Sequence, residues 1–266
     1  MKDHSTPDML IFDVDGVLLD VRGSFPEVIR ACITKGWEKF CGGAADGNQY
    51  TDEHERILKR HGAFNDDYDL AWAMLSMSAA TGAKKLSEAF PSPGKLVEEI
   101  KTFHGTVREW VVSRYGDIVP RGETRELCNE LYTGTESHRG LHLLETPMLA
   151  ANWKDIPLPV GIYSGRDTHE WTMGKESLGW RDFPDDMTIL SDSGITKPSP
   201  RGLEILCERA GAKAPCFFGD TASDLFAYNA FGKGLFAAIG GLLPDAEYVF
   251  PDTNAAVKAM LALAGK

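Results

Sequence analysis

A short apolar run that ends in two carboxylates is the feature that most constrains the fold of this chain. Met9–Phe12 is too short for a helix and lies between polar segments, so it predicts a buried parallel strand of an α/β sheet. Asp13 and Asp15 follow, with Gly16 behind them. Open α/β sheets bind ligands at the carboxyl ends of their strands. On this segment alone an ordinary Asp-Gly turn is an equally good interpretation.

A second apolar run near the C-terminus repeats this order. Within Ala214–Leu225 a short strand is followed by glycine and then by acidic residues. Asp224 follows Asp220 by one helical turn, so a helix that starts near Thr221 would direct both side chains to one point above the sheet. The alternative is that Asp220 caps this helix and Asp224 complements its dipole.

A third strand is predicted to stop at a hydroxyl group. Leu158–Arg166 is apolar up to Tyr163 and continues with Ser164 and Gly165. A hydroxyl next to a free N–H can hold an anion, although a simple strand-to-loop turn would have the same residues.

A lysine precedes a predicted helix start. Lys197 is followed by Ser199 as N-cap and Pro200 at the first helical position, and Gly211 lies near the helix end. A stiff backbone therefore positions Lys197, whereas a lysine in isolation would usually be a solvated charge.

Each of these four segments also has a purely structural interpretation. If all four structural interpretations were correct, the occurrence of such polar residues in four separate loops next to strands or helix starts would be a coincidence. If Asp13, Asp15, Asp220 and Asp224 share one site, each pair about 4 Å apart repels by roughly 4 kcal/mol at an effective dielectric constant near 20. A cation must compensate them. A small set of hard oxygen ligands suits Mg²⁺, which also binds substrate phosphates.

Composition excludes several classes of partner. The net charge of -11 and pI of about 5.1 argue against nucleic acid and anionic membranes, which require clustered cations. No apolar run approaches the roughly 20 residues of a membrane span, and the N-terminus carries no signal region. We therefore expect a soluble, cytoplasmic protein. The five scattered cysteines predict reduced thiols.

About 120 residues separate the first acidic pair from the strand before Ser164, enough for a small domain. Trp72, Met74, Met77 and Trp110 are predicted core residues. Helices are predicted over Phe25–Phe40, Asp52–His61, Asp69–Ala80, Gly94–Phe103 and Arg121–Leu131.

The C-terminal segments are predicted to complete the parallel sheet, and they contain no candidate catalytic residues. They are strands over Leu235–Ile239 and Tyr248–Phe250 and a helix over Thr253–Ala264.

The motifs Asp13-Val14-Asp15-Gly16, Tyr163-Ser164-Gly165, Lys197-Pro198-Ser199-Pro200 and Gly219-Asp220-Thr221-Ala222-Ser223-Asp224 resemble, in order and context, the four motifs of the haloacid dehalogenase superfamily. The chain is most similar to phosphoglycolate-phosphatase-like members, whose helical cap follows the first motif. The resemblance implies an α/β fold: a Rossmann-like parallel sheet with helices on both faces in a catalytic core of residues 1–21 and 145–266, and a mainly α-helical cap domain of residues 22–144.

The resemblance also implies the chemistry. Asp13 would attack phosphorus to form an aspartyl-phosphate, and Asp15 would protonate the leaving oxygen and later activate water. Because dehalogenases lack this second aspartate, Asp15 favours phosphate chemistry.

The ligand set is likewise implied. Asp13, the main-chain carbonyl of Asp15 and Asp220 would hold Mg²⁺, with Asp224 contributing directly or through water. The transferring phosphoryl group would be held by Ser164, Gly165 and Lys197.

Substrate choice is expected to reside in the cap. Arg22 and Arg166 are the cations placed to meet a substrate carboxylate or second phosphate, or else to form ion pairs. We expect a Mg²⁺-dependent phosphatase, monomeric or homodimeric, that acts on a small phosphorylated molecule. The alternatives are a phosphomutase or phosphonatase on the same core, or a non-catalytic protein that binds a phosphorylated ligand.

Overall fold

The computed structural model describes residues 6–47 and 49–266. The chain forms two compact units. We call Met1–Val21 with Glu145–Lys266 the core unit, and Arg22–Leu144 the inserted unit.

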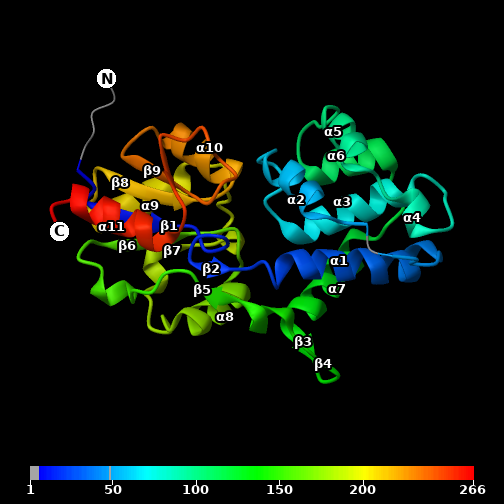
Figure 1. Ribbon diagram of the computed structural model, residues 1–266, viewed down its shortest axis with the longest axis horizontal. Coiled ribbons are helices and arrows are strands. Elements are labelled where there is room, and N and C mark those ends of the chain that lie inside the picture. The colour runs from blue at the N-terminus through cyan, green and yellow to red at the C-terminus, as the bar shows by residue number, and fades with distance from the viewer. Residues whose placement is uncertain (1–5, 48) are drawn as a thin grey trace. The chain divides into compact units, whose positions relative to one another are not determined.

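Within the described residues the core unit has a six-stranded sheet in the order β10-β9-β8-β1-β6-β7 (Figure 1). Every neighbouring pair is parallel, which confirms the predicted sheet. Its strands are β1 (Met9–Phe12), β6 (Val160–Tyr163), β7 (Thr188–Ile189), β8 (Pro215–Gly219), β9 (Leu235–Ile239) and β10 (Tyr248–Phe250).

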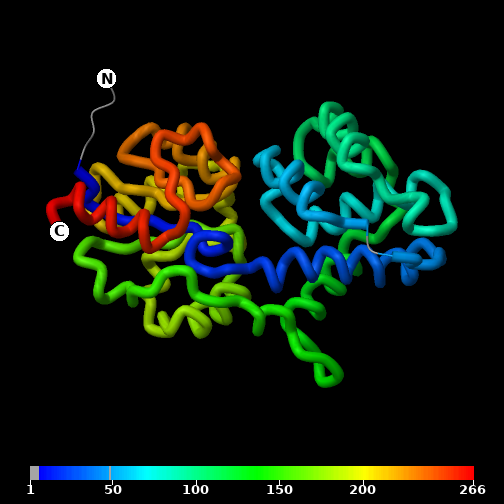
Figure 2. The backbone as a smooth tube through the Cα atoms, viewed as in Figure 1, coloured from blue at the N-terminus to red at the C-terminus, as the bar shows by residue number. Residues whose placement is uncertain are grey.

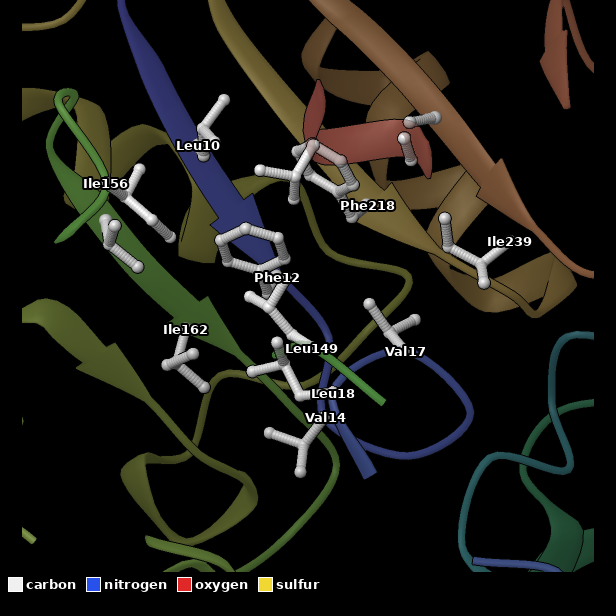
Figure 3. Packing of buried hydrophobic residues seen from close by; sticks show 14 of the residues in the cluster. Leu10, Phe12, Val14, Val17, Leu18, Leu149, Ile156, Ile162, Phe218 and Ile239 are labelled. Carbon is white, nitrogen blue, oxygen red and sulfur yellow. The ribbon is translucent and has the colours of Figure 1, made fainter. Parts of the chain in front are cut away.

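Strand β1 is buried on both sides because its side chains alternate between two hydrophobic clusters. Leu10 and Phe12 belong to one cluster, shown in Figure 3, and Met9 and Ile11 belong to the other. The first cluster includes residues of α8 (Thr168–Leu178) and α11 (Thr253–Leu263), and the second includes residues of α9 (Arg201–Ala210) and α10 (Ala222–Phe231). Helices therefore cover both faces of the sheet, as a Rossmann-like α/β fold requires.

The strand order and register determine where polar residues emerge. The chain runs outward from β1 to β6 and β7, and then places β8, β9 and β10 on the other side of β1. Phe12 is in register with both Ile162 and Phe218. The residues that follow β1, β6 and β8 therefore share the carboxyl edge of the sheet at a reversal of strand order, where open α/β sheets bind ligands.

The segments that lead into and out of the inserted unit are paired. Strand β2 (Leu19–Asp20) is antiparallel to β5 (Thr146–Pro147), and Figure 2 follows the chain from β1 into β2 and later back into β5.

Short 3₁₀ turns elsewhere in the core unit are η3 (Trp153–Asp155), η4 (Asp185–Met187) and η5 (Ser191–Ser193).

The inserted unit is mainly helical and packs around α3. Helix α3 is apolar and buried on nearly all sides, as expected of a central helix. Trp72, Met74, Met77 and Trp110 are buried, which confirms them as core. The elements are α1 (Phe25–Gly36), η1 (Trp37–Cys41), α2 (Asp52–Lys59), α3 (Asp67–Ala79), α4 (Leu86–Ala89), α5 (Pro93–Ile100), α6 (Val107–Tyr115), α7 (Arg121–Thr133), β3 (Gly134–Thr135), β4 (His138–Arg139) and η2 (Leu141–Leu144).

Several features of the inserted unit differ from the sequence prediction, among them the short helix α4, the β3–β4 pair and the end of α5 at Ile100. The first helix is α-helical only to Gly36 and continues as the π-helical turn η1, which ends at Gly42 in the left-handed conformation. The pattern of apolar residues does not predict the bounds of helix α6. Its start is marked instead by the capping box of Thr106 and Glu109.

Among the described residues no helix combines the length and apolar character that a membrane crossing needs. All five cysteines are free.

Truncating the central sheet should destabilise the core unit. Ile162 of β6 is fully buried, so Ile162→Ala should lower the free energy of unfolding by about 2–5 kcal/mol. The control Val249→Ala, at an exposed position of β10, should cost less than about 1 kcal/mol. Urea unfolding of both variants measures the difference, and equal losses would contradict the position assigned to β6.

Candidate active site

A buried lysine joins two of the predicted segments. Lys197 Nζ lies 2.8 Å from Asp13 Oδ2 and 2.7 Å from Asp224 Oδ1, and its side chain is 1% exposed. The main-chain N–H of Val14 donates to the other oxygen of Asp13, Oδ1, at 2.7 Å. Residues that are far apart in sequence therefore converge beyond the ends of β1 and β8.

The segment that carries Lys197 is anchored to β6. The Tyr163 hydroxyl donates to the carbonyl of Ser199 at 2.8 Å. The prediction of Ser199 as N-cap is wrong by one residue, since α9 begins at Arg201 with Pro200 as its cap. Ser199 Oγ instead accepts the N–H of Arg201 at 3.2 Å. Gly211 ends the helix in the left-handed conformation, as predicted.

Asp224 is held by the start of α10. Thr221 is the N-cap in place of Asp220, and its hydroxyl donates to Asp224 Oδ2 at 2.7 Å. The N–H groups of Thr221 and Asp220 donate to the same oxygen at 3.0 and 3.3 Å. With Oδ1 on Lys197, both oxygens of Asp224 are engaged, so its side chain orients the lysine.

Asp220 lies against the loop that follows β1. A Cβ atom on Gly16, which has φ +71°, would lie 2.2 Å from Asp220 Oδ2. Glycine is therefore required there, both for its left-handed backbone and for this approach. Carboxylate oxygens of Asp13, Asp220 and Asp224 lie within 4.8 Å of one another, which makes them a candidate metal cluster.

The charges of this cluster do not balance. The cluster holds three carboxylates, and Lys197 pairs with two of them, Asp13 and Asp224. Burial raises the pKa of Asp13 to about 7; Lys197 opposes this shift and Asp224 adds to it. Burial alone would lower the pKa of Lys197, but Asp13 and Asp224 outweigh it and raise this pKa. A set of hard oxygen donors with excess negative charge fits a divalent cation.

The predicted anion-binding residues Ser164 and Gly165 directly follow β6. Ser164 is buried, its N–H donates to the carbonyl of Ile189 at 3.0 Å, and its Oγ accepts the N–H of Arg166 at 3.3 Å. Gly165 is exposed. Because β6 neighbours β1 in register, Ser164 and Asp13 emerge from adjacent strands.

Asp15 and Arg166 form an ion pair. Arg166 Nε and Nη2 both donate to Asp15 Oδ1, at 2.8 and 2.6 Å. Nη2 also lies 3.0 Å from Glu145 Oε2. The Arg166 side chain is completely buried between these two carboxylates of the protein, so it forms ion pairs, which is the alternative role expected from the sequence.

Arg22 is exposed and is the first residue of the inserted unit. The other predicted site residues belong to the core unit.

The family follows from comparison with known proteins. The model of the haloacid dehalogenase-like hydrolases matches residues 7–232. The chain belongs to this hydrolase family. No curated protein sequence matches it.

Solved structures share the fold over nearly the whole hydrolase. Phosphatase Tt82 from Thermococcus thioreducens has 25% identity and a TM-score of 0.67, with 97% of this chain and 100% of that chain covered. A predicted phosphoglycolate phosphatase from Haemophilus somnus has 14% identity and a TM-score of 0.56, with 97% and 99% covered. A protein assigned as a β-phosphoglucomutase from Thermotoga maritima has 14% identity and a TM-score of 0.50, with 96% and 99% covered.

Two residues of this site were not predicted from the hydrolase sequence. The pattern Thr221-x-x-Asp224 is a capping-box signal that would have indicated the Thr221 contact. Glu145 is a single acidic residue before β5, and no local pattern marks it as buried.

Replacing Gly16 should disturb the acidic cluster specifically. Gly16→Ala and the control Gly240→Ala both place a Cβ atom on a residue with positive φ. At Gly240, however, this Cβ would have no other atom within 4 Å. Only the Gly16 variant should displace Asp220 and remove the stabilisation of the protein by added Mg²⁺. Thermal unfolding with and without Mg²⁺ tests this, and an unchanged response in Gly16→Ala would contradict the close approach.

Proposed function

We propose that the protein is a Mg²⁺-dependent phosphatase that hydrolyses a small phosphomonoester through an aspartyl-phosphate on Asp13. The observation that carries the proposal is the convergence of Asp13, Asp220 and Asp224 at the carboxyl edge of the sheet, where Lys197 pairs with Asp13 and Asp224. Membership of the hydrolase family and the likeness to a protein named as a phosphatase support it.

Asp13 is the proposed nucleophile. One of its carboxylate oxygens attacks phosphorus, the bond from phosphorus to the leaving oxygen breaks, and Asp15 gives that oxygen a proton. Asp15 then takes a proton from water, which attacks phosphorus and releases inorganic phosphate. Asp13 returns to its free form.

Positive charge and N–H groups bind the phosphoryl oxygens. Lys197 has three N–H groups, and its ion pairs with Asp13 and Asp224 use two of them. We assign the third, with Ser164 and the N–H of Gly165, to the transferring group. In this proposal Arg166 binds the carboxylates of Asp15 and Glu145. Arg22 is a candidate for contact with the substrate.

The acidic cluster is the proposed metal site. Asp13, Asp220 and the carbonyl of Asp15 would hold Mg²⁺ directly, and Asp224 would act through Lys197 or a bound water. When bound, the ion supplies charge that stabilises the transferring phosphoryl group. We further propose that the core unit is catalytic and that the inserted unit is a cap that selects the substrate.

Removing the nucleophile should abolish turnover. Asp13→Asn should lower p-nitrophenyl phosphate hydrolysis by roughly 10³-fold or more, because an amide cannot form the intermediate. A chelator should have a comparable effect on the wild type, and added Mg²⁺ should reverse it. The control Asp245→Asn, at an exposed position, should keep full activity. Undiminished activity in Asp13→Asn would overturn the assignment.

Mg²⁺ should stabilise the folded protein without any substrate. An ion at about 100 times its Kd adds about 2.7 kcal/mol, and Asp220→Asn should remove most of this gain. Thermal unfolding at increasing Mg²⁺ measures it. A wild type that does not respond would argue against the metal site.

Product analysis separates a phosphatase from a phosphomutase with the same core. With a sugar phosphate as substrate, we expect inorganic phosphate and free sugar. An isomeric sugar phosphate without phosphate release would exclude hydrolysis as the main reaction.

A further inference from the structure

We infer that Arg166 and Glu145 are positioning residues that fix Asp15 for proton transfer to the leaving oxygen. This inference rests on the proposed phosphatase function, in which Asp15 is the acid. It assigns a role to Glu145, which no sequence motif marks, and replaces the substrate-binding role expected for Arg166.

Asp15 is restrained by its backbone and by its side chain. The carbonyl of Val14 accepts the N–H groups of Val17, Leu18 and Leu19, at 3.3, 2.8 and 2.9 Å, which closes the loop that contains Asp15. The hydroxyl of Thr253, in α11, donates to the carbonyl of Val17. The loop therefore holds the main chain, and Arg166 determines where the carboxylate points.

Arg166 selects between the two oxygens of Asp15. Both Nε and Nη2 donate to Oδ1. Because Oδ1 accepts two charged N–H donors, we assign the transferred proton to Oδ2. The Asp15 side chain is 28% exposed whereas that of Arg166 is fully buried. Arg166 thus engages one oxygen of Asp15, and the other oxygen is the one we assign to the reaction.

The guanidinium group is itself fixed from two further sides. Nη1 donates to the carbonyl of Glu170 in α8 at 3.2 Å, and Gly174 of α8 leaves room for it, since a Cβ there would lie 3.0 Å from Nη1. Glu145, whose side chain is fully buried, holds Nη2 at 3.0 Å. The fork geometry of arginine suits this arrangement, and a lysine could not reproduce it.

Proton transfer to the leaving oxygen makes the rate depend on the basicity of the leaving group, and this dependence can be measured. As the bond from phosphorus to the leaving oxygen breaks, the electron pair stays with that oxygen and the Oδ2 proton of Asp15 neutralises it. A good leaving group, such as dinitrophenolate, needs little protonation, whereas phenolate and alkoxide need much more. Misplacing Asp15 should therefore slow the reaction in proportion to the basicity of the leaving group.

The experiment measures kcat/KM for dinitrophenyl, p-nitrophenyl and phenyl phosphate in the wild type, Arg166→Met and Asp15→Asn. We use kcat/KM because it reports the steps up to transfer onto Asp13. Arg166→Met should lose about a hundredfold with phenyl phosphate and less than about tenfold with dinitrophenyl phosphate. The control Arg201→Met removes an exposed arginine that pairs with Glu204 and Glu208 and should leave all three values unchanged.

A second pair of variants keeps the test decisive if Arg166→Met does not fold. Glu145→Ala frees one side of Nη2 and should give a smaller loss with the same leaving-group dependence. Glu145→Gln keeps the shape of the side chain but removes the charge that pairs with Nη2, and it should give an intermediate loss with the same leaving-group dependence. In the Asp15→Asn background the Glu145→Ala substitution should have no further leaving-group-dependent effect, because its action passes through Asp15.

The outcomes separate this inference from the function on which it rests. If the wild type hydrolyses these esters and the variants lose activity evenly across the series, the positioning role is wrong and the phosphatase stands. Additive losses in the Asp15→Asn background would also overturn the positioning role. If the wild type shows no chelator-sensitive hydrolysis of any ester, the proposed function itself fails.

Discussion

The pairing of β1 with both β6 and β8 is the constraint on which the site depends. Because the first strand lies in the middle of the sheet and is buried on both faces, the residue that follows it, Asp13, emerges where the strand order reverses. The segments after β6 and β8 emerge beside it. A shift of one residue in β1 would exchange Leu10 and Phe12 with Met9 and Ile11 between the two clusters, so core packing also sets the place of Asp13.

Two buried cations organise the polar edge of the sheet, and each serves two carboxylates. Lys197 joins Asp13 and Asp224, and Arg166 joins Asp15 and Glu145. Lysine is a compact charge and suits a position between two acids that must also leave an N–H for a ligand. Arginine offers a rigid fork and suits an acid whose orientation must be fixed.

Apolar patterning predicted the parts of the fold that depend on burial. The central strands β1, β6, β8 and β9 are runs of four or five mainly apolar residues, and β1, β9 and β10 have the predicted bounds. The convergence of Asp13, Asp220, Asp224 and Lys197 was predicted because each follows a strand or precedes a helix. Whether a residue follows a strand or precedes a helix can be read from its neighbours in the sequence.

Glu145 could not be predicted in this way. It lies in an irregular segment between η2 and β5, and its burial depends on Arg166, which is distant in sequence. The same holds for Arg166, since a cation after a strand could face either a ligand or a protein carboxylate. Only the tertiary position of Glu145 decides between them.

The two proposed catalytic acids are held by different parts of the core unit. Asp13 ends a central strand and depends on Lys197, whereas Asp15 lies in a loop bridged to Leu19, and Leu19 belongs to β2, which pairs with β5. Glu145 directly precedes β5. Asp15 is therefore held by the bridge to Leu19, by Arg166 after β6 and, through Arg166, by the residue before β5. The proposed proton donor depends on the segments through which the chain leaves and re-enters the core unit, whereas the proposed nucleophile is paired with Lys197.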